Sequence, residues 1–381
     1  MSGKRSGVVA LMFRIAGMPK PSAGSTTGGR ARTLAQVYRH FGEFDAAETS
    51  PLYERVAIAL SESDEALRAI EAAPARKRHP TVILAALHDL VLAGRAPALA
   101  AAYSATDRDA AARAAIDTLL GMTDSVGAIA ARRLTLTNET GRYAVLYPAI
   151  AEAARRVGAD AAGLIDVGRS AALNLNVDRV CITYGNGQSL GDPSSDVQLS
   201  CSVVGDRPVP PRAMPEVVAR IGIDLDPVDV TDPDDARWLR ACLSPDQRER
   251  AARLEAEITL AATAAPLLIQ GHAVEVLPDA IARVPSDALP MVTTTWALSR
   301  LPLEDRLRFV HCLDEAARDR PVAWVSAEGV GVAPEIPTLG DRRASGHSII
   351  GLAVFDRSTL RAEAIGRCWS RGNFLAWLAD S

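Results

Sequence analysis

Two periodicities of apolar residues divide this chain into two regions. Up to about residue 158, apolar residues recur at spacings of three and four, as in Leu34, Val37 and Phe41, which predicts one face of a helix. Ser50-Pro51 then supplies a cap and a first-turn proline for a helix over residues 52–60. No run in this region alternates as a strand would. We therefore expect an all-helical N-terminal domain over residues 33–158.

From residue 159 onward, short apolar and β-branched runs alternate with helical stretches, the longest over residues 234–263 and 303–318. Residues 185–196, rich in Gly, Asn and Ser, separate two strand-like runs and predict an inserted hairpin around residues 180–205. Strands alternating with helices predict an α/β domain with a Rossmann-like, mainly parallel sheet over residues 159–381. The predicted strands are residues 163–167, 180–184, 197–204, 221–225, 267–270, 291–294, 322–326 and 349–355.

Composition and charge narrow the classes of function. The 381 residues suffice for two domains, and 48% hydrophobic with 23% charged residues is typical of soluble globular proteins. The net charge of −4 provides no basic excess for nucleic acid or anionic lipid. No stretch approaches the roughly 20 apolar residues of a membrane span. We expect a cytoplasmic protein whose partner is a small molecule, not nucleic acid or a membrane, and the sequence leaves its oligomeric state open.

Neither the N-terminal residues nor the spacing of the cysteines and histidines indicates a function. Residues 1–32 are predicted to be a disordered tail, because Pro, Ser, Gly and Thr dominate residues 19–29. Lys4, Arg5 and the apolar run after them resemble a signal peptide, but Arg14 interrupts that run. The five cysteines form no C-x-x-C pair and the six histidines no H-E-x-x-H pattern. Free thiols and no metal site are expected.

The first predicted strand ends in an acid and a turn of small residues, Asp166-Val-Gly168-Arg-Ser170. Small residues let the backbone approach a ligand, and the N–H groups of a following helix would remain exposed. A dinucleotide fingerprint needs three glycines, but Ser170 and Leu173 occupy the other two positions. The pattern favours a nucleoside ligand without a pyrophosphate. The alternative is a tight strand-to-helix turn that binds nothing.

Three later strand ends carry polar or aromatic groups. Asp224, in a Gly-Ile-Asp-Leu-Asp-Pro run, can accept two hydrogen bonds from a ribose diol, unless the run only makes turns. Gly271-His272 follows the next strand. Thr295-Trp296 ends another, where the indole could stack on a ring or belong to the core. Ligands gather at the carboxyl ends of strands in open α/β sheets, so these residues are candidate ligand contacts.

A polar segment, Thr137-Asn138-Glu139-x-x-Arg142, precedes the first strand in an otherwise Ala- and Leu-rich region. Functionally, Asn138 and Glu139 could contact substrate, with Glu139 as acceptor or base and Arg142 orienting an anion. Alternatively, the segment is a helix N-cap, with Arg142 paired to an acid. Glu328, at the end of another predicted strand, is a second candidate acid or base.

Taken in order, these strand ends resemble a class I S-adenosylmethionine-dependent methyltransferase core. The resemblance implies that Asp166, Gly168 and Ser170 lie beside the methionine part of the cofactor. It implies that Asp224 holds the ribose diol and that Gly271-His272 lies at the adenine amino group. The implied fold is a methyltransferase-type sheet, the implied cofactor is S-adenosylmethionine, and the implied reaction is methyl transfer to a small acceptor.

A closer resemblance, over about residues 34–378, is to a bacterial domain-of-unknown-function family. Three positions depart from that family's pattern: Ala172 replaces a glycine, His272 an aspartate and Arg371 a histidine. These departures leave open a different ligand or a loss of catalysis. The matching segments are Thr137-Asn-Glu-Thr-Gly-Arg142, Gly168-Arg-Ser-Ala-Ala-Leu-Asn-Leu175, Ile221-Gly-Ile-Asp-Leu-Asp-Pro-Val-Asp229, Arg237-Trp-Leu239, Ala323-Trp-Val-Ser-Ala-Glu328 and Gly372-Asn-Phe-Leu-Ala-Trp377.

Three classes of function remain. The first is a methyltransferase, which mainly has to align a nucleophile with the methyl group. The second is a non-catalytic nucleoside-binding or regulatory protein on the same scaffold. The third is an unrelated hydrolase or oxidoreductase, for which the chain lacks both G-x-S-x-G and G-x-G-x-x-G motifs.

Overall fold

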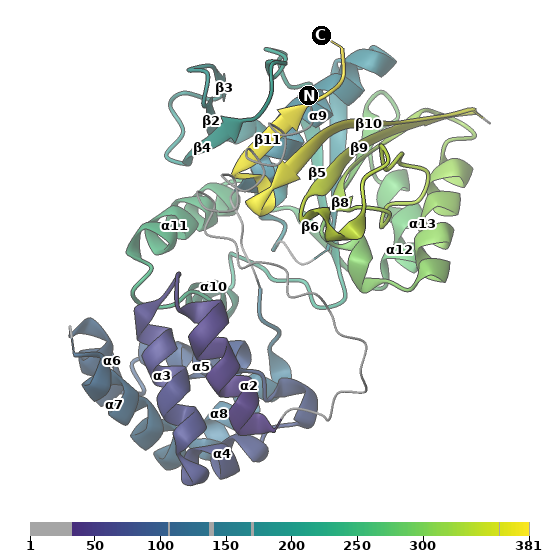
Figure 1. Cartoon of the computed structure of the whole chain (residues 1–381). Helices are drawn as coiled ribbons and strands as arrows, with labels where there is room; N and C mark the ends of the chain where they lie inside the picture. Colours follow the sequence, from purple (N-terminus) through teal and green to yellow (C-terminus); the bar gives the residue numbers. More distant parts are fainter. Residues whose placement is uncertain (1–32, 106, 137–140, 169–170, 358, 381) are drawn as a thin grey trace. The chain divides into compact units, whose positions relative to one another are not determined.

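The computed structural model describes residues 33–105, 107–136, 141–168, 171–357 and 359–380. They form two compact units (Figure 1). The helical unit comprises Met1–Leu136 and Pro233–Glu255, and the α/β unit comprises Thr137–Asp232 and Ala256–Ser381. The predicted boundary at residues 158 and 159 therefore differs from the division in the structure, and the predicted tail, residues 1–32, lies outside the described residues.

The helical unit is built from short helices, and several of them begin at a residue whose side chain caps the helix. The Thr33 side chain accepts from Gln36 N at the start of the first helix, and Ser50 accepts from Tyr53 N at 3.0 Å. Proline follows Ser50 at the first helical position, as the sequence predicts. The elements are α2 (Leu34–His40), η1 (Phe41–Ala46), α3 (Pro51–Glu62), α4 (Asp64–Glu71), η2 (Ala75–Lys77), α5 (Pro80–Leu92), α6 (Pro97–Ser104), α7 (Arg108–Gly121), α8 (Thr123–Arg132), α10 (Pro233–Ala241) and the first part of α11 (Arg248–Ala262).

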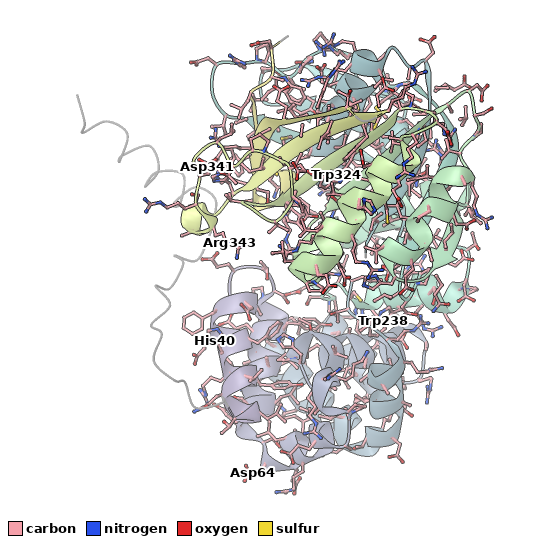
Figure 2. All side chains as sticks on the ribbon, turned by 90° about the vertical axis from the view of Figure 1, so that its right-hand side faces the viewer. His40, Asp64, Trp238, Trp324, Asp341 and Arg343 are labelled. Atoms are coloured by element: carbon pink, nitrogen blue, oxygen red, sulfur yellow. The ribbon has the colours of Figure 1, made fainter. Side chains whose placement is uncertain are left out.

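Long-range polar contacts attach α10 and the start of α11 to this unit. Trp238, labelled in Figure 2, is buried, and its Nε1 donates to the Leu134 carbonyl at 2.8 Å. Arg237 Nε pairs with the buried Asp89 carboxylate at 2.9 Å. Asp246 accepts hydrogen bonds from the Ser50 hydroxyl and from Leu52 N. A segment that follows a strand along the chain therefore belongs to the helical core.

The described residues of the α/β unit form an 11-stranded sheet in the order β3-β2-β4-β11-β10-β9-β8-β7-β1-β5-β6. Its strands are β1 (Ala161–Val167), β2 (Cys181–Tyr184), β3 (Ser189–Gly191), β4 (Gln198–Val203), β5 (Glu216–Asp224), β6 (Leu267–Gln270), β7 (Leu289–Thr295), β8 (Val322–Gly329), β9 (Ser348–Asp356), β10 (Thr359–Trp369) and β11 (Phe374–Trp377). Its helices are α9 (Gly141–Val157), η3 (Leu173–Arg179), the rest of α11, α12 (Ala273–Ala282), η4 (Leu298–Arg300), α13 (Leu303–Ala316), η5 (Arg343–Ser345) and η6 (Ser370–Gly372).

Strands β6, β5, β1, β7 and β8 pair in parallel, and the strand order reverses between β1 and β7. These five strands have the 3-2-1-4-5 order of doubly wound α/β sheets. Beyond β8 the sheet departs from that pattern, because β9, β10 and β11 continue as an antiparallel meander. The predicted α/β class with a mainly parallel sheet is confirmed. The hairpin predicted around residues 180–205 is different in the structure: its two predicted strands, β2 and β4, pair in parallel, and β2 pairs antiparallel with β3, which lies in the predicted loop.

Alternating side chains of the sheet bury two apolar cores. One face packs against α9, with Leu164 of β1 and Met291 of β7 in that core. The other face packs against α12 and α13 (Figure 1). Trp324 of β8, labelled in Figure 2, meets Phe309 of α13 with ring centroids 5.5 Å apart. In these parallel strands one residue in two faces α9.

The connection from β1 to β5 differs from the predicted strand-to-helix turn. Among its described residues it contains the short η3 turn and strands β2 to β4 in place of a regular α-helix. Ala171 and Ala172 have φ of 53° and 55°, which an α-helix does not allow. Helix α9, which precedes β1, therefore covers the face where a crossover helix would lie.

Candidate functional site

Polar side chains gather where β1 and β7 end, at the reversal of strand order. Asp166 of β1 lies opposite Thr293 of β7 and Gly222 of β5. Helix α9 runs into β1 through a tight turn at Gly158, which has φ of 72°. Because of this turn, the N-terminal end of α9, with Arg142, lies at the same edge of the sheet as the end of β1.

A hydrogen-bond network joins a buried carboxylate to a buried guanidinium at this edge. Asp166, 1% exposed, accepts from Thr293 Oγ1 at 2.8 Å and from Asn174 Nδ2 at 3.2 Å. Asn174 Nδ2 also lies 3.2 Å from Thr295 Oγ1, which accepts from an Arg142 Nη at 3.2 Å. Burial of a charged group requires such partners, so the network fixes the orientation of Arg142.

Trp296 stacks on Arg142 through an unusual backbone conformation. The Arg142 guanidinium carbon lies 5.4 Å from the indole centroid, which is the geometry of a cation–π contact. Trp296 has φ of 52°, outside the strand region, so Thr295 and Trp296 contact the same side chain although they are consecutive. Its Nε1 donates to Ser348 Oγ at 2.8 Å. For a bulky residue such a φ costs about 1–3 kcal/mol, and it recurs at functional sites.

The turn after β1 requires glycine at one position and favours it at another. Gly168 has φ of 121°, and a Cβ built on it would lie 2.7 Å from the Ala297 Cβ. Ala172, with φ of 55°, contacts Gly222, where a Cβ would lie 3.0 Å from the Ala172 methyl group. A glycine at position 172 would adopt this φ without steric strain. The predicted contact Ser170 lies outside the described residues.

Asp224 and His272 lie side by side at the ends of β5 and β6. Asp224 is partly buried, its Oδ1 accepts from Asp226 N at 3.1 Å, and its carbonyl accepts from Gly271 N at 2.9 Å. His272 precedes α12, and its Nε2 lies 3.6 Å from Asp305 Oδ2. His272 Nδ1 is buried and has no hydrogen-bond partner among the described residues. The structure thus brings the predicted ribose and adenine contacts together.

Glu328 lies on the opposite face of the sheet from Arg142. It follows Trp324 and Ser326 at every second residue of β8, on the face that packs against α12 and α13. Its Oε1 accepts from Ala297 N at 2.9 Å and from Leu298 N at 3.0 Å, and Oε2 is buried with no partner among the described residues. Burial raises the pKa of Glu328 to about 7, which suits an acid or base, but these contacts hold the loop after β7.

Comparison with protein families gives a match over residues 35–377 to a family with the description "Uncharacterized protein conserved in bacteria (DUF2332)". This chain belongs to the DUF2332 family. The family membership predicted from the sequence motifs is confirmed, and that description carries no activity. No curated protein matches this DUF2332 sequence.

Two segments that support the family resemblance meet at the start of α9. A Cβ on Gly141 would lie 2.5 Å from the Arg371 carbonyl oxygen, and one on Gly372 would lie 2.0 Å from the Gly141 oxygen. Ser370, Arg371 and Gly372 all have positive φ. The backbone contact requires both glycines and brings the Arg371 turn to the edge that carries Arg142.

Sequence reasoning missed three residues of this DUF2332 site: Asn174, Thr293 and Ser348. Asn174 belongs to the Gly168–Leu175 family segment, which is the signal that could have found it. The predicted substrate contacts Asn138 and Glu139 lie outside the described residues.

No group of three His, Cys, Asp or Glu that could hold a metal occurs in the part of the chain that the structure describes. None of its helices alone is long and apolar enough to cross a membrane, although two bent helix pairs meet that test by length and composition. The five cysteines are free thiols.

Proposed function

We propose that this DUF2332 protein binds S-adenosylmethionine at the carboxyl ends of β1, β5 and β6 and is a methyltransferase for a small acceptor. The observation that carries the proposal is the position of Asp224, one strand away from the reversal of strand order between β1 and β7. In sheets of this order, ligands bind at that reversal and an acid at the end of the second strand holds the ribose.

The residues present fit a nucleoside better than a dinucleotide. Asp224 offers a partly buried carboxylate that can accept from both ribose hydroxyls. His272 Nδ1 is buried with no partner among the described residues, and as an unprotonated ring nitrogen it is an acceptor for the adenine amino group. Of the three fingerprint positions only residue 168 is glycine, so the chain lacks the glycines that a pyrophosphate-binding turn needs.

S-adenosylmethionine carries a methyl group on its sulfonium, and a correctly positioned nucleophile can accept that methyl group. This chain's own residues contribute orientation. Arg142, held by Thr295 and covered by Trp296, presents a fixed positive charge at the end of β7. A guanidinium binds carboxylate or phosphate, so we assign it to an anionic group of the acceptor. Since orientation alone can supply a large part of the rate enhancement, the network around Asp166 is expected to position Arg142.

A non-catalytic nucleoside-binding protein is the second candidate. One observation favours it: Glu328, whose pKa suits a base, faces α12 and α13 and not Arg142. An acceptor that has to lose a proton would then need a base from elsewhere.

Calorimetry of the full chain with S-adenosylhomocysteine and S-adenosylmethionine tests the proposal. We expect saturable binding that Asp224→Ala weakens by about tenfold or more, since a hydrogen bond to a charged group is worth roughly 1.5–3 kcal/mol. The matched control is Asp226→Ala, which removes an exposed carboxylate two residues further along the chain. This variant should bind both ligands as tightly as the wild type. No binding by folded protein at millimolar ligand, or equal losses in both variants, would contradict the proposal.

A transfer assay separates the two candidates. The protein is incubated with methyl-labelled S-adenosylmethionine and a bacterial small-molecule extract. Label transferred to a component of the extract supports the methyltransferase. Binding without transfer supports the non-catalytic candidate.

A further inference from the structure

The helical unit contains a cavity of about 370 Å³ that the proposed function does not use. Its walls come from α5, α6 and the segment from Arg240 to Glu255, all within that unit. A volume of this size accommodates a small organic molecule. Apolar side chains make up much of the lining, including Val91, Leu92, Ala100 and Leu243.

Tyr103 lines one wall of the cavity, and its side chain is 9% exposed. Its hydroxyl group is buried and makes no hydrogen bond to any described residue. Burial raises the pKa of Tyr103 well above its ordinary value, so the hydroxyl stays neutral and can donate. An unpaired buried hydroxyl is costly, and a ligand with an acceptor would relieve that cost. Tyr53, the neighbouring phenol, already donates to the Leu84 carbonyl at 3.3 Å.

The other polar groups leave one positive charge at the cavity. Arg240 and Glu255 form a two-point ion pair with distances of 2.6 and 2.7 Å, so their charges cancel. Burial lowers the pKa of His88, whose Nδ1 donates to the Leu243 carbonyl at 2.9 Å. Arg248 is exposed at the rim and has no acidic partner among the residues described. A ligand that matches this lining is apolar in the middle and anionic at one end.

We propose that this cavity binds an apolar monocarboxylate, with the carboxylate at Arg248 and a polar group of the opposite end at Tyr103. The inference is independent of nucleoside binding, because every lining residue belongs to the helical unit. The site would give the helical unit a ligand of its own, distinct from the ligand of the sheet.

Three related probes test the two ends of the ligand separately. Para-hydroxyphenylpropionate carries both polar groups, phenylpropionate lacks the hydroxyl, and phenylpropionamide lacks the charge. Calorimetry on the full chain is expected to show that para-hydroxyphenylpropionate binds most tightly and phenylpropionamide most weakly.

Two variants then localise the binding. Arg248→Gln should weaken the binding of the two carboxylate probes by roughly fivefold, so that they no longer bind more tightly than the amide. Tyr103→Phe should abolish the advantage of the hydroxylated probe. Arg113→Gln, an exposed arginine of α7 away from the cavity, is the control for charge, and Asp224→Ala is the control for the sheet.

The proposal is overturned if folded wild-type protein binds none of the carboxylates up to their solubility limits. It is also overturned if Arg248→Gln and Arg113→Gln have the same effect, or if Tyr103→Phe leaves the preference for the hydroxylated probe intact. Loss of probe binding in Asp224→Ala would show that the probes bind at the sheet, and it would contradict the proposal as well.

Discussion

Replacing Glu328 by glutamine should change how the stability of the protein depends on pH. The Glu328 carboxyl is 1% exposed, and one of its oxygens has no partner among the described residues. The glutamine oxygen can still accept from Ala297 N and Leu298 N, so Glu328→Gln retains the contacts that hold the loop after β7. The variant removes only the ability to ionise.

The size of the effect follows from the shift in the pKa of Glu328, from 4.5 to about 7. The folded state holds the proton more tightly than the unfolded state, so this carboxyl's contribution to stability is greatest below pH 4.5. The contribution falls as the pH rises and is lost above pH 7. A shift of this size corresponds to about 3 kcal/mol of unfolding free energy. Glu328→Gln should therefore gain about 3 kcal/mol relative to wild type between pH 4.5 and pH 8.

Urea unfolding of both proteins at the two pH values, followed by tryptophan fluorescence, measures this difference. Comparing variant with wild type at each pH cancels the contributions of all other titrating groups. Glu335→Gln, on an exposed residue of the β8–β9 loop, is the control and should show the same difference at both pH values. A constant difference for Glu328→Gln would refute the assignment of a neutral buried carboxyl.

Three further substitutions test individual parts of the structure by their unfolding free energies. Gly168→Ala should lower the unfolding free energy by about 2–4 kcal/mol, because the new methyl group adds backbone strain and a close contact with Ala297. Gly158→Ala is the control: its methyl group meets open space, so only about 1–2 kcal/mol should be lost. Equal losses in the two variants would contradict the packing of the turn after β1. Thr295→Val removes the acceptor of two buried donors and should lose about 1–3 kcal/mol, and a neutral outcome would contradict the network. Tyr103→Phe should stabilise the ligand-free protein by about 1 kcal/mol, and destabilisation would show that the hydroxyl has a partner.

The sequence predicted strands better than it predicted which segments pack together. Apolar runs located β1, β6 and β9 within one or two residues, because each strand is a short run dominated by apolar residues. It missed β10, whose Ala, Arg and Glu residues have low strand propensity and are ordered by the pairing with β9. It also predicted one helix over residues 234–263, where α10 and α11 are separate.

The predicted domain boundary differs from the division in the structure, because that division depends on contacts between residues far apart in the sequence. The attachment of Trp238 to Leu134 and of Asp246 to Ser50 joins residues far apart in the sequence, and no local pattern encodes such contacts. Helix α9 has helical periodicity like the segments before it, and periodicity predicts a helix without showing that it packs on the sheet.

At the candidate site, strand-end residues were predictable and their partners were not. Asp166, Asp224 and Thr295 lie where strands end, as the acid or hydroxyl after an apolar run indicated. The contact of Arg142 with Trp296 depends on a positive φ at Trp296, which no sequence pattern favours for an aromatic residue. The separation of Glu328 from Arg142 follows from the register of β8 in the sheet.

A crystal structure of the full chain with S-adenosylhomocysteine is the most direct test of nucleoside binding at the end of β5. We expect the ribose hydroxyls within hydrogen-bond distance of the Asp224 carboxylate, with the adenine at His272 and the thioether end towards Gly168. Ligand bound elsewhere, or a site at Asp224 that stays empty at saturating ligand, would contradict it.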